Sequence, residues 1–263
     1  MAPAAAEVLA ALGAEETVVG IGDFVTWPPV LAGKPKVGAY DRPNAERILD
    51  LGGEVFVTTR GQAGATARAQ LERLGIAVVE LETATTAGVI EAIGELGRRT
   101  GREVESARLA AEVAAGIERV RVRAEGLPRR RVLLAVGIEP LYVAGPGSYL
   151  DELIGAAGGS NVAADALAPF QLLSIEAALE RMPEVIIDTS DNRAGAARGR
   201  VLGTWARWPF LPAVRERRVY VVDPTALSIP GPRLPAMAEL IAQFVHPEVF
   251  GEAPAGAFEA FGR

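Results

Sequence analysis

Short apolar runs alternate along the chain with segments whose apolar residues recur at helical spacing. Runs of four to six residues rich in Val, Ile and Leu are typical of buried strands, and the amphipathic segments between them are long enough for helices. The predicted strands include residues 17–21, 37–40, 55–59, 76–81, 131–136 and 218–223. The predicted helices include residues 3–12, 63–74, 86–99 and 234–245. This alternation indicates βαβ units, so the predicted fold class is α/β with mainly parallel sheets.

One helix–strand unit occurs twice, without a gap in either copy. NAERILDLGGEVFVTT, residues 44–59, matches SIEAALERMPEVIIDT, residues 174–189, at one constant offset. The first residue of each copy, Asn or Ser, suits a helix N-cap. Glu46 and Glu176 then fall in the first helical turn, where a carboxylate favours the positive end of the helix dipole. Copies this far apart exceed the roughly 20 to 50 residues of a solenoid repeat, so we interpret them as duplication of a whole lobe.

A single long helix is predicted between the two copies. From Arg102 to about Glu125 the only turn signal is Gly116, while small and branched apolar residues recur at helical spacing. A helix of about 23 residues is about 35 Å long, which suits a strut between two lobes. The alternative is an ordinary surface helix inside one domain. The predicted organisation is an N-terminal α/β lobe, residues 1–101, a linker helix, residues 102–127, and a C-terminal α/β lobe, residues 128–263.

Composition and charge exclude several classes of protein. The 263 residues are 49% hydrophobic, which is ample for sizeable cores. A net charge of -6 with scattered arginines gives no electrostatic footprint for nucleic acid. The absence of cysteine excludes disulfides, thiolate metal sites and cysteine nucleophiles. No run of 18 apolar residues is present, so no membrane-spanning helix is expected.

The only histidine, His246, argues against catalytic triads and zinc sites, which need imidazoles converging from separate segments. Pro247 follows it and would end a helix. We therefore interpret His246 as a helix-terminal or surface residue with no role in a site. No metal site, cofactor or catalytic residue is predicted.

Several segments along nearly the whole chain occur in an order shared with one family. They are APAAAEVLAALGA, VGIGDFVTWPP, VGAYDRPNAERIL, GIAVVELET, SIEAALERMPEVIIDT and PGPRLPAMAELIAQFVHPE. In this order, and with the long helix, they resemble the periplasmic substrate-binding proteins of bacterial ABC importers for cobalamin and ferric siderophores. The resemblance implies two Rossmann-like lobes joined by one long rigid helix. It also implies a non-enzymatic, monomeric protein that captures a bulky ligand between the lobes and delivers it to an ABC permease.

The resemblance also implies two sets of site residues. Glu46 and Glu176 match the glutamates with which the family docks onto arginines of the permease, and the internal repeat independently places them in equivalent positions. Aromatic side chains in loops would wall the ligand, because π-faces suit a flat macrocycle or a catecholate chelate, and arginines would supply charge. The implied ligand-binding residues are Phe24, Trp27, Tyr40, Arg60, Phe170 and Arg233.

Alternative ligands and functions remain open from the residues alone. The aromatic loops favour a corrinoid over a ferric siderophore, and Tyr40 and Tyr142 keep haem as a further alternative. A two-lobed enzyme that binds a nucleotide or metallocofactor would have only Asp23 and Glu139 as candidate titratable groups. A cytoplasmic protein that sequesters a corrinoid or metal chelate is a third possibility.

Localisation depends on which signal is followed. The resemblance implies a periplasmic or otherwise extracytoplasmic protein. The first residues, MAPAAAEVLAALGAEE, have no basic region and Glu7 interrupts their apolar stretch, so they do not form a signal peptide. The chain would be cytoplasmic if Met1 were the true start.

Overall fold

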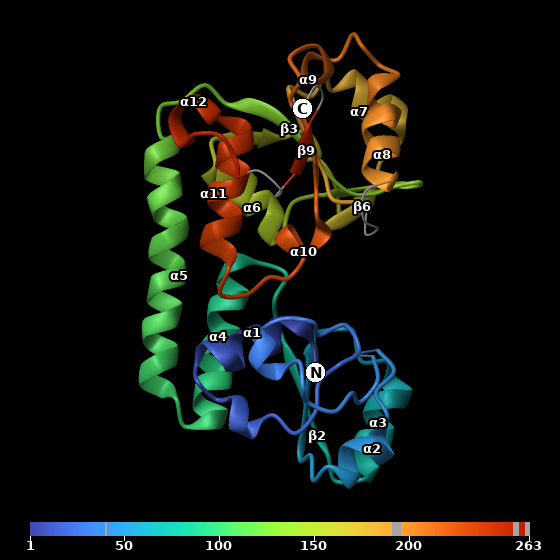
Figure 1. The fold of residues 1–263 in the computed structure, drawn as a ribbon, viewed down its shortest axis with the longest axis vertical. Coiled ribbons are helices and arrows are strands. Elements are labelled where there is room, and N and C mark those ends of the chain that lie inside the picture. The colour runs from blue at the N-terminus through green and yellow to red at the C-terminus, as the bar shows by residue number, and fades with distance from the viewer. Residues whose placement is uncertain (40, 191–195, 255–257, 261–263) are drawn as a thin grey trace. The chain divides into compact units, whose positions relative to one another are not determined.

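The computed structural model describes residues 1–39, 41–190, 196–254 and 258–260 (Figure 1). The chain divides into two compact units. Unit 1 comprises Met1–Ala114 with Ile229–Pro232, and unit 2 comprises Ala115–Ser228 with Arg233–Arg263. Helix α5 (Glu103–Ala124) begins in unit 1 and ends in unit 2.

Unit 1 is built around two parallel strands. β1 (Val55–Thr59) pairs with β2 (Ala77–Leu81) from Val55↔Ala77 to Thr59↔Leu81. Its core contains Val37, Ala45, Ile48, Phe56, Leu71 and Ile76. The helices of this unit are α1 (Pro3–Ala11), α2 (Ala45–Asp50), α3 (Ala65–Arg73) and α4 (Thr86–Thr100), with single 3₁₀ turns at Glu15–Thr17 and Pro29–Leu31.

Two strands predicted in unit 1 are wrong in extent. Residues 17–21 and 37–40 form no regular strand among the described residues, and only Ile21, at the end of the first run, forms a parallel bridge, with Lys36 just before the second run. Gly38 has a φ of 90°, which lies outside the extended region and interrupts the second run. An apolar run of four or five residues was therefore not enough to build a ladder here.

Unit 2 contains a larger sheet with mixed strand directions. Its path is β6-β4-β3-β7-β8-β9, with β5 also paired to β3. The strands are β3 (Arg130–Ile138), β4 (Leu141–Ala144), β5 (Gly159–Asn161), β6 (Phe170–Leu172), β7 (Val185–Asp188), β8 (Val219–Val222) and β9 (Phe258–Ala260). The helices are α6 (Tyr149–Ala156), α7 (Ile175–Glu180), α8 (Ala196–Ala206), α9 (Pro212–Arg215), α10 (Pro224–Leu227), α11 (Leu234–Val245) and α12 (Pro247–Phe250).

The α/β class is confirmed, but the expected predominance of parallel pairing is wrong for unit 2. β3, β5, β7 and β8 pair in parallel, whereas the β3–β4, β4–β6 and β8–β9 pairs are antiparallel. Only Glu139 and Pro140 connect β3 to β4, and a connection of two residues can join only antiparallel strands.

The two sequence copies have the same local structure. Asn44 caps α2 by accepting a hydrogen bond from the Arg47 N–H at 2.9 Å, and Ser174 caps α7 by accepting from Ala177 N–H at 3.1 Å. Each helix leads into a strand, β1 or β7. The residue that turns the chain between them has a positive φ in both copies, 70° at Gly52 and 47° at Met182. The two copies thus share a backbone conformation at a position where their residue types differ, Gly52 and Met182.

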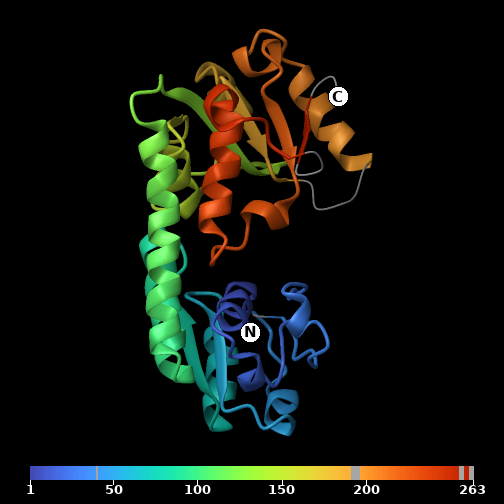
Figure 2. The same ribbon diagram turned by 60° about the vertical axis from the view of Figure 1, so that its left-hand side comes forward.

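Gly116 in the middle of α5 has a packing role. A Cβ built there would lie 2.5 Å from the side chain of Pro235, near the start of α11. The glycine therefore lets α11 approach the second half of α5, and Figures 1 and 2 show these helices side by side. Arg123 and Glu239 join the same pair of helices at 2.9 Å.

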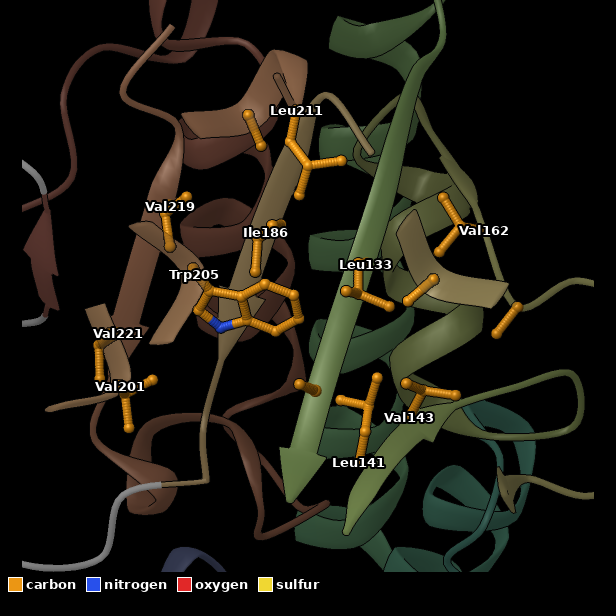
Figure 3. Packing of buried hydrophobic residues seen from close by; sticks show 14 residues of the cluster. Leu133, Leu141, Val143, Val162, Ile186, Val201, Trp205, Leu211, Val219 and Val221 are labelled. Carbon is orange, nitrogen blue, oxygen red and sulfur yellow. The ribbon is translucent and has the colours of Figure 1, made fainter. Parts of the chain in front are cut away.

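The core of unit 2 is organised around Trp205 on α8. Its indole is fully buried with Leu133, Ile186 and Val219 of the sheet (Figure 3). The indole N–H donates to the buried carboxylate of Asp188 at 2.7 Å, which leaves this large side chain without an unsatisfied donor. Trp205 is therefore a core residue, whereas Phe210, close to it in sequence, is 52% exposed.

His246 is a helix-terminal residue, as predicted, but the alternative of a surface position is wrong. It lies between α11 and α12 and is fully buried. Its Nδ1 lies 3.0 Å from Glu248 Oε1, and its Nε2 faces Gly158, where a Cβ would come within 3.0 Å. The turn at Gly158 lacks a side chain and so leaves room for the imidazole.

Glu248 should make unit 2 sensitive to acid. Burial raises the pKa of its carboxyl, but a backbone hydrogen bond, His246 and Arg130 outweigh this and lower the pKa to about 2. A depressed folded-state pKa contributes stability above the unfolded value of 4.5 that is lost as the pH falls toward about 2. Because the side chain is 49% exposed, we expect Glu248→Gln to lower the free energy of unfolding at pH 7 by only about 1 kcal/mol.

Urea unfolding of both proteins between pH 7 and pH 2.5 measures this effect. The difference in unfolding free energy should shrink below about pH 4.5, because protonation then removes the same interactions in the native protein. A difference that stayed constant over this range would contradict the assigned role of the carboxylate.

Candidate functional site

The loop after Ile21 presents two large aromatic side chains to solvent. Phe24 is 61% exposed and Trp27 is 52% exposed, while Val25 and Leu31 are buried and anchor the loop. Lys36 also fixes it, since its Nζ donates to the carbonyl oxygens of Gly22 (3.1 Å), Asp23 (3.4 Å) and Val25 (2.7 Å). The exposure of both aromatics is thus a property of an anchored loop.

Contacts through the N-terminal residues connect this loop to β1. Ala2 N–H donates to the carbonyl oxygen of Val57 in β1 at 3.0 Å. A Cβ on Gly22 would lie 2.5 Å from the carbonyl oxygen of Met1, so the backbone of the loop packs closely against the same segment. The N-terminal residues therefore connect the start of this loop, at Gly22, to the middle of β1.

A charged pair occupies the carboxyl ends of the two parallel strands. Arg60 directly follows β1 and Glu82 directly follows β2, and parallel strands end at the same edge of a sheet. Arg60 Nε lies 3.3 Å from Glu82 Oε2. Arg60 was expected as a polar ligand-binding residue, and the structure adds a partner that no sequence motif indicated.

In unit 2, Phe170 lies in a group of exposed apolar side chains. It is 42% exposed on the short strand β6. β6 pairs with β4 through Ala144↔Phe170 and Tyr142↔Leu172, and directly paired residues project to the same face of a sheet. Tyr142 and Leu172 are exposed as well. Strand pairing therefore places Phe170, Tyr142 and Leu172 on one apolar face, of which the ligand-binding set predicted from sequence contained only Phe170.

The positions of the other two predicted ligand residues, Arg233 and Tyr40, say little about a ligand site. Arg233 is the partly buried residue that precedes α11, at its N-cap. Tyr40 lies outside the described residues. The structure therefore places Phe24, Trp27 and Arg60 in unit 1 and Phe170 and Arg233 in unit 2.

Glu46 and Glu176 occupy equivalent and accessible positions. Each lies in the first turn of a six-residue helix, α2 or α7, and each is exposed. Neither carboxylate has a hydrogen-bond or ion-pair partner among the described residues. Their exposure leaves both free to contact a basic surface.

Comparison with known proteins gives the family. The model of the family described as periplasmic binding protein matches residues 1–226. The chain belongs to this family. Its members are substrate-binding proteins of ABC importers, so the prediction of a non-enzymatic binding protein is confirmed.

Individual relatives of this binding protein differ in their ligands. An uncharacterised ABC transporter substrate-binding lipoprotein, YvrC of Bacillus subtilis, is 27% identical over 257 residues, covering 95% of this chain and 80% of that protein. A vitamin B12-binding protein of Salmonella typhi is 29% identical over 187 residues, covering 71% of this chain and 70% of that protein. The periplasmic haem-binding protein RhuT of Roseiflexus sp. RS-1 superposes with a TM-score of 0.80 at 27% identity, covering 92% of this chain and 95% of that structure.

A cavity in unit 1 of this binding protein lies apart from the predicted ligand residues. Its volume is about 290 Å³, and it lies beside the first half of β1. Gly53, Glu54 and Val55 line it together with Leu96 and Thr100 of α4, and none of the predicted ligand residues does. Among the described residues, no three potential metal-ligating side chains come together, and no helix has the length and apolarity needed to cross a bilayer.

Proposed function

We propose that this binding protein captures a corrinoid or a ferric siderophore through exposed side chains of both units and delivers it to an ABC permease. The observation that carries the proposal is the exposure of Phe24, Trp27 and Phe170 on anchored elements. A buried aromatic would serve the core, whereas an exposed one leaves an apolar surface open for a partner. A relative that binds vitamin B12 supports the corrinoid.

We extend this proposal to the organisation of the chain. Residues 1–101 and 128–263 act as ligand-binding lobes of Rossmann-like type, and residues 102–127 act as the rigid linker. The protein works as a monomer outside the cytoplasm, and the proposed location is supported by relatives described as lipoprotein and periplasmic. Its permease contacts Glu46 and Glu176.

Haem is the second candidate ligand. RhuT, a haem-binding relative, supports it, and so does the exposed phenol of Tyr142, since a tyrosine oxygen is one of the groups that can bind haem iron. Tyr142 shares an apolar face with Phe170, which suits a flat macrocycle. A titration with haem in parallel with the other ligands separates the two candidates.

Ligand binding should quench the fluorescence of Trp27, and this provides the test. Titration with cyanocobalamin, cobinamide, haem and ferric siderophores should identify at least one ligand with a Kd below about 10 μM, which corresponds to about 7 kcal/mol. Trp27→Ala should weaken that ligand by about tenfold, because it removes a stacking surface worth about 1 to 2 kcal/mol. The variant is measured by calorimetry, since it lacks the reporter.

Phe210→Ala provides a matched control for Trp27→Ala. Phe210 is also an aromatic residue with 52% exposure, but it lies outside the proposed ligand-binding set. We expect its removal to leave ligand affinity within about twofold. Failure of every ligand to bind below about 10 μM would remove the main support for the proposed function.

A further inference from the structure

We propose that Glu82 positions Arg60 and that their ion pair selects ligands by charge, favouring a neutral, amide-bearing ligand such as a corrinoid over a polyanionic ferric chelate. The inference rests on the proposed function and specifies its substrate class. The sequence resemblance indicated only a polar ligand-binding role for Arg60, and its positive charge by itself would favour an anionic ligand. The negative charge of Glu82 offsets that of Arg60 and so removes this preference.

Glu82 is held in place by its surroundings. Its Oε1 accepts a hydrogen bond from the N–H of Ala84 at 2.9 Å. Its aliphatic stem packs over Gly88 in the first turn of α4, where a Cβ would lie 2.8 Å from Glu82 Cγ. Any larger residue at Gly88 would push this side chain away. The carboxylate is thus fixed on two sides before any ligand arrives.

Arg60 depends on this fixed carboxylate for its orientation. Its side chain is 68% exposed, compared with 36% for Glu82, and its Nε is the atom nearest the carboxylate, at 3.3 Å. A guanidinium carries five N–H donors in a rigid fork. Contact through Nε leaves the terminal N–H groups for a ligand while the carboxylate offsets the positive charge. Oriented donors without net charge suit the carbonyl oxygens of amides better than they suit a multiply charged anion.

Lys36, another cation of unit 1, already uses its N–H donors within the protein. Lys36 has three N–H donors, and its Nζ is within hydrogen-bond distance of three carbonyl oxygens in the loop that carries Phe24 and Trp27. Asp23 lies in the same loop. The formal charges of Lys36 and Asp23 cancel, so the proposed ligand residues of unit 1 offer aromatic area and oriented donors without an excess of positive charge.

Paired affinity measurements on two probes test the proposal. The probes are cyanocobalamin and a ferric tris-catecholate, and the wild type should bind cyanocobalamin at least about tenfold more tightly. In Glu82→Gln, the uncompensated charge of Arg60 should increase the affinity for the catecholate by about tenfold at low salt. The affinity for cyanocobalamin should instead fall by about two- to fivefold, because Arg60 is no longer oriented. Opposite changes for the two probes are not expected from general damage to the fold.

Two variants control for other effects of Glu82→Gln. Glu80→Gln removes a carboxylate of β2 that pairs with Arg68 of α3 at 2.7 Å, and it should change neither affinity by more than about twofold. The double variant Arg60→Gln with Glu82→Gln returns the net charge of this residue pair to zero, so the increase in catecholate affinity seen in Glu82→Gln should disappear. High salt should also reduce that gain. If Glu82→Gln does not fold, Arg60→Gln alone leaves the negative charge and should weaken the catecholate further.

The outcomes separate this inference from the proposed function. If the wild type binds neither these probes nor haem below about 10 μM, the proposed function itself fails. If cyanocobalamin binds but neither Glu82→Gln nor Arg60→Gln changes catecholate affinity, the charge-selection inference is overturned and the proposed function stands. A wild type that prefers the catecholate to cyanocobalamin overturns the inference as well.

Discussion

Replacing Trp205 with alanine should lower the free energy of unfolding of unit 2 by about 3 to 5 kcal/mol. The indole is fully buried among Leu133, Ile186 and Val219, so its loss removes apolar contacts and leaves a cavity beside the sheet. The substitution also removes the N–H that donates to Asp188 at 2.7 Å. A buried carboxylate that loses a donor adds to the cost. Urea unfolding followed by circular dichroism measures the change.

Two further substitutions separate the contributions to this loss of stability. Trp205→Phe keeps part of the apolar volume but removes the donor, so its effect should fall between the wild type and Trp205→Ala. Phe210→Ala removes an exposed aromatic nearby in sequence and should change stability by less than about 1 kcal/mol. Equal effects of Trp205→Ala and Phe210→Ala would contradict the assignment of Trp205 to the core.

The second large effect is expected for Glu46→Ala combined with Glu176→Ala. If each exposed carboxylate makes a charge-assisted hydrogen bond to the permease, each loss costs about 1.5 to 2 kcal/mol. Together they correspond to a loss of about 3 to 4 kcal/mol, or about 100- to 1,000-fold in the affinity of docking. Ligand affinity should not change, because the proposed docking residues are not among the proposed ligand-binding residues. Uptake in a reconstituted system and ligand titration measure the two quantities separately.

Asp50→Ala combined with Glu180→Ala is the matched control. These carboxylates lie one turn later on α2 and α7, are exposed, and occupy equivalent positions in the repeat. The control removes the same total charge from the same helices, so a purely electrostatic effect of net charge would appear in both double variants. We expect docking to fall by less than about fivefold in the control. Loss of ligand affinity in Glu46→Ala with Glu176→Ala would place those residues at the ligand and reject the docking assignment.

Local structure was predictable from sequence wherever hydrogen bonds and periodicity are themselves local. The predicted helix at 234–245 has the bounds of α11, and the long helix differs from α5 by only a few residues. Asn44 and Ser174 cap their helices, since a side chain and an N–H three residues apart meet in the first turn whatever surrounds them. The match of the two copies likewise needed no knowledge of distant contacts.

Strand pairing was less predictable, because it depends on partners far away in sequence. The apolar runs at 17–21 and 37–40 resemble strands, but Gly38 has a positive φ and the described residues form only the bridge Ile21↔Lys36, beside the second run. β5, β6 and β9 are three residues each, which is too short for a period-two pattern to reveal. The antiparallel pairs of unit 2 follow from connections and edges that periodicity does not encode.

The candidate site was likewise only partly predictable from sequence. Sequence singled out Phe24, Trp27, Arg60 and Phe170 as residue types suited to a flat ligand, but it could not separate exposed aromatics from buried ones. Trp27 and Trp205 have the same side chain, and only packing assigns one to solvent and the other to the core. Glu82 carries no motif, because its contact with Arg60 arises from two strands that end at the same edge.

The sequence by itself determined the α/β class, the duplicated helix–strand unit with Glu46 and Glu176 at equivalent positions, and membership of a family of binding proteins. These features rest on local periodicity, capping and the order of segments, all of which depend on residues near one another in sequence or on their linear order. The tertiary structure decided the burial of His246, the exposure of Phe24 and Trp27, and the pairing of Arg60 with Glu82. Burial and charge pairing depend on which distant segments meet, and that is settled only when the chain packs.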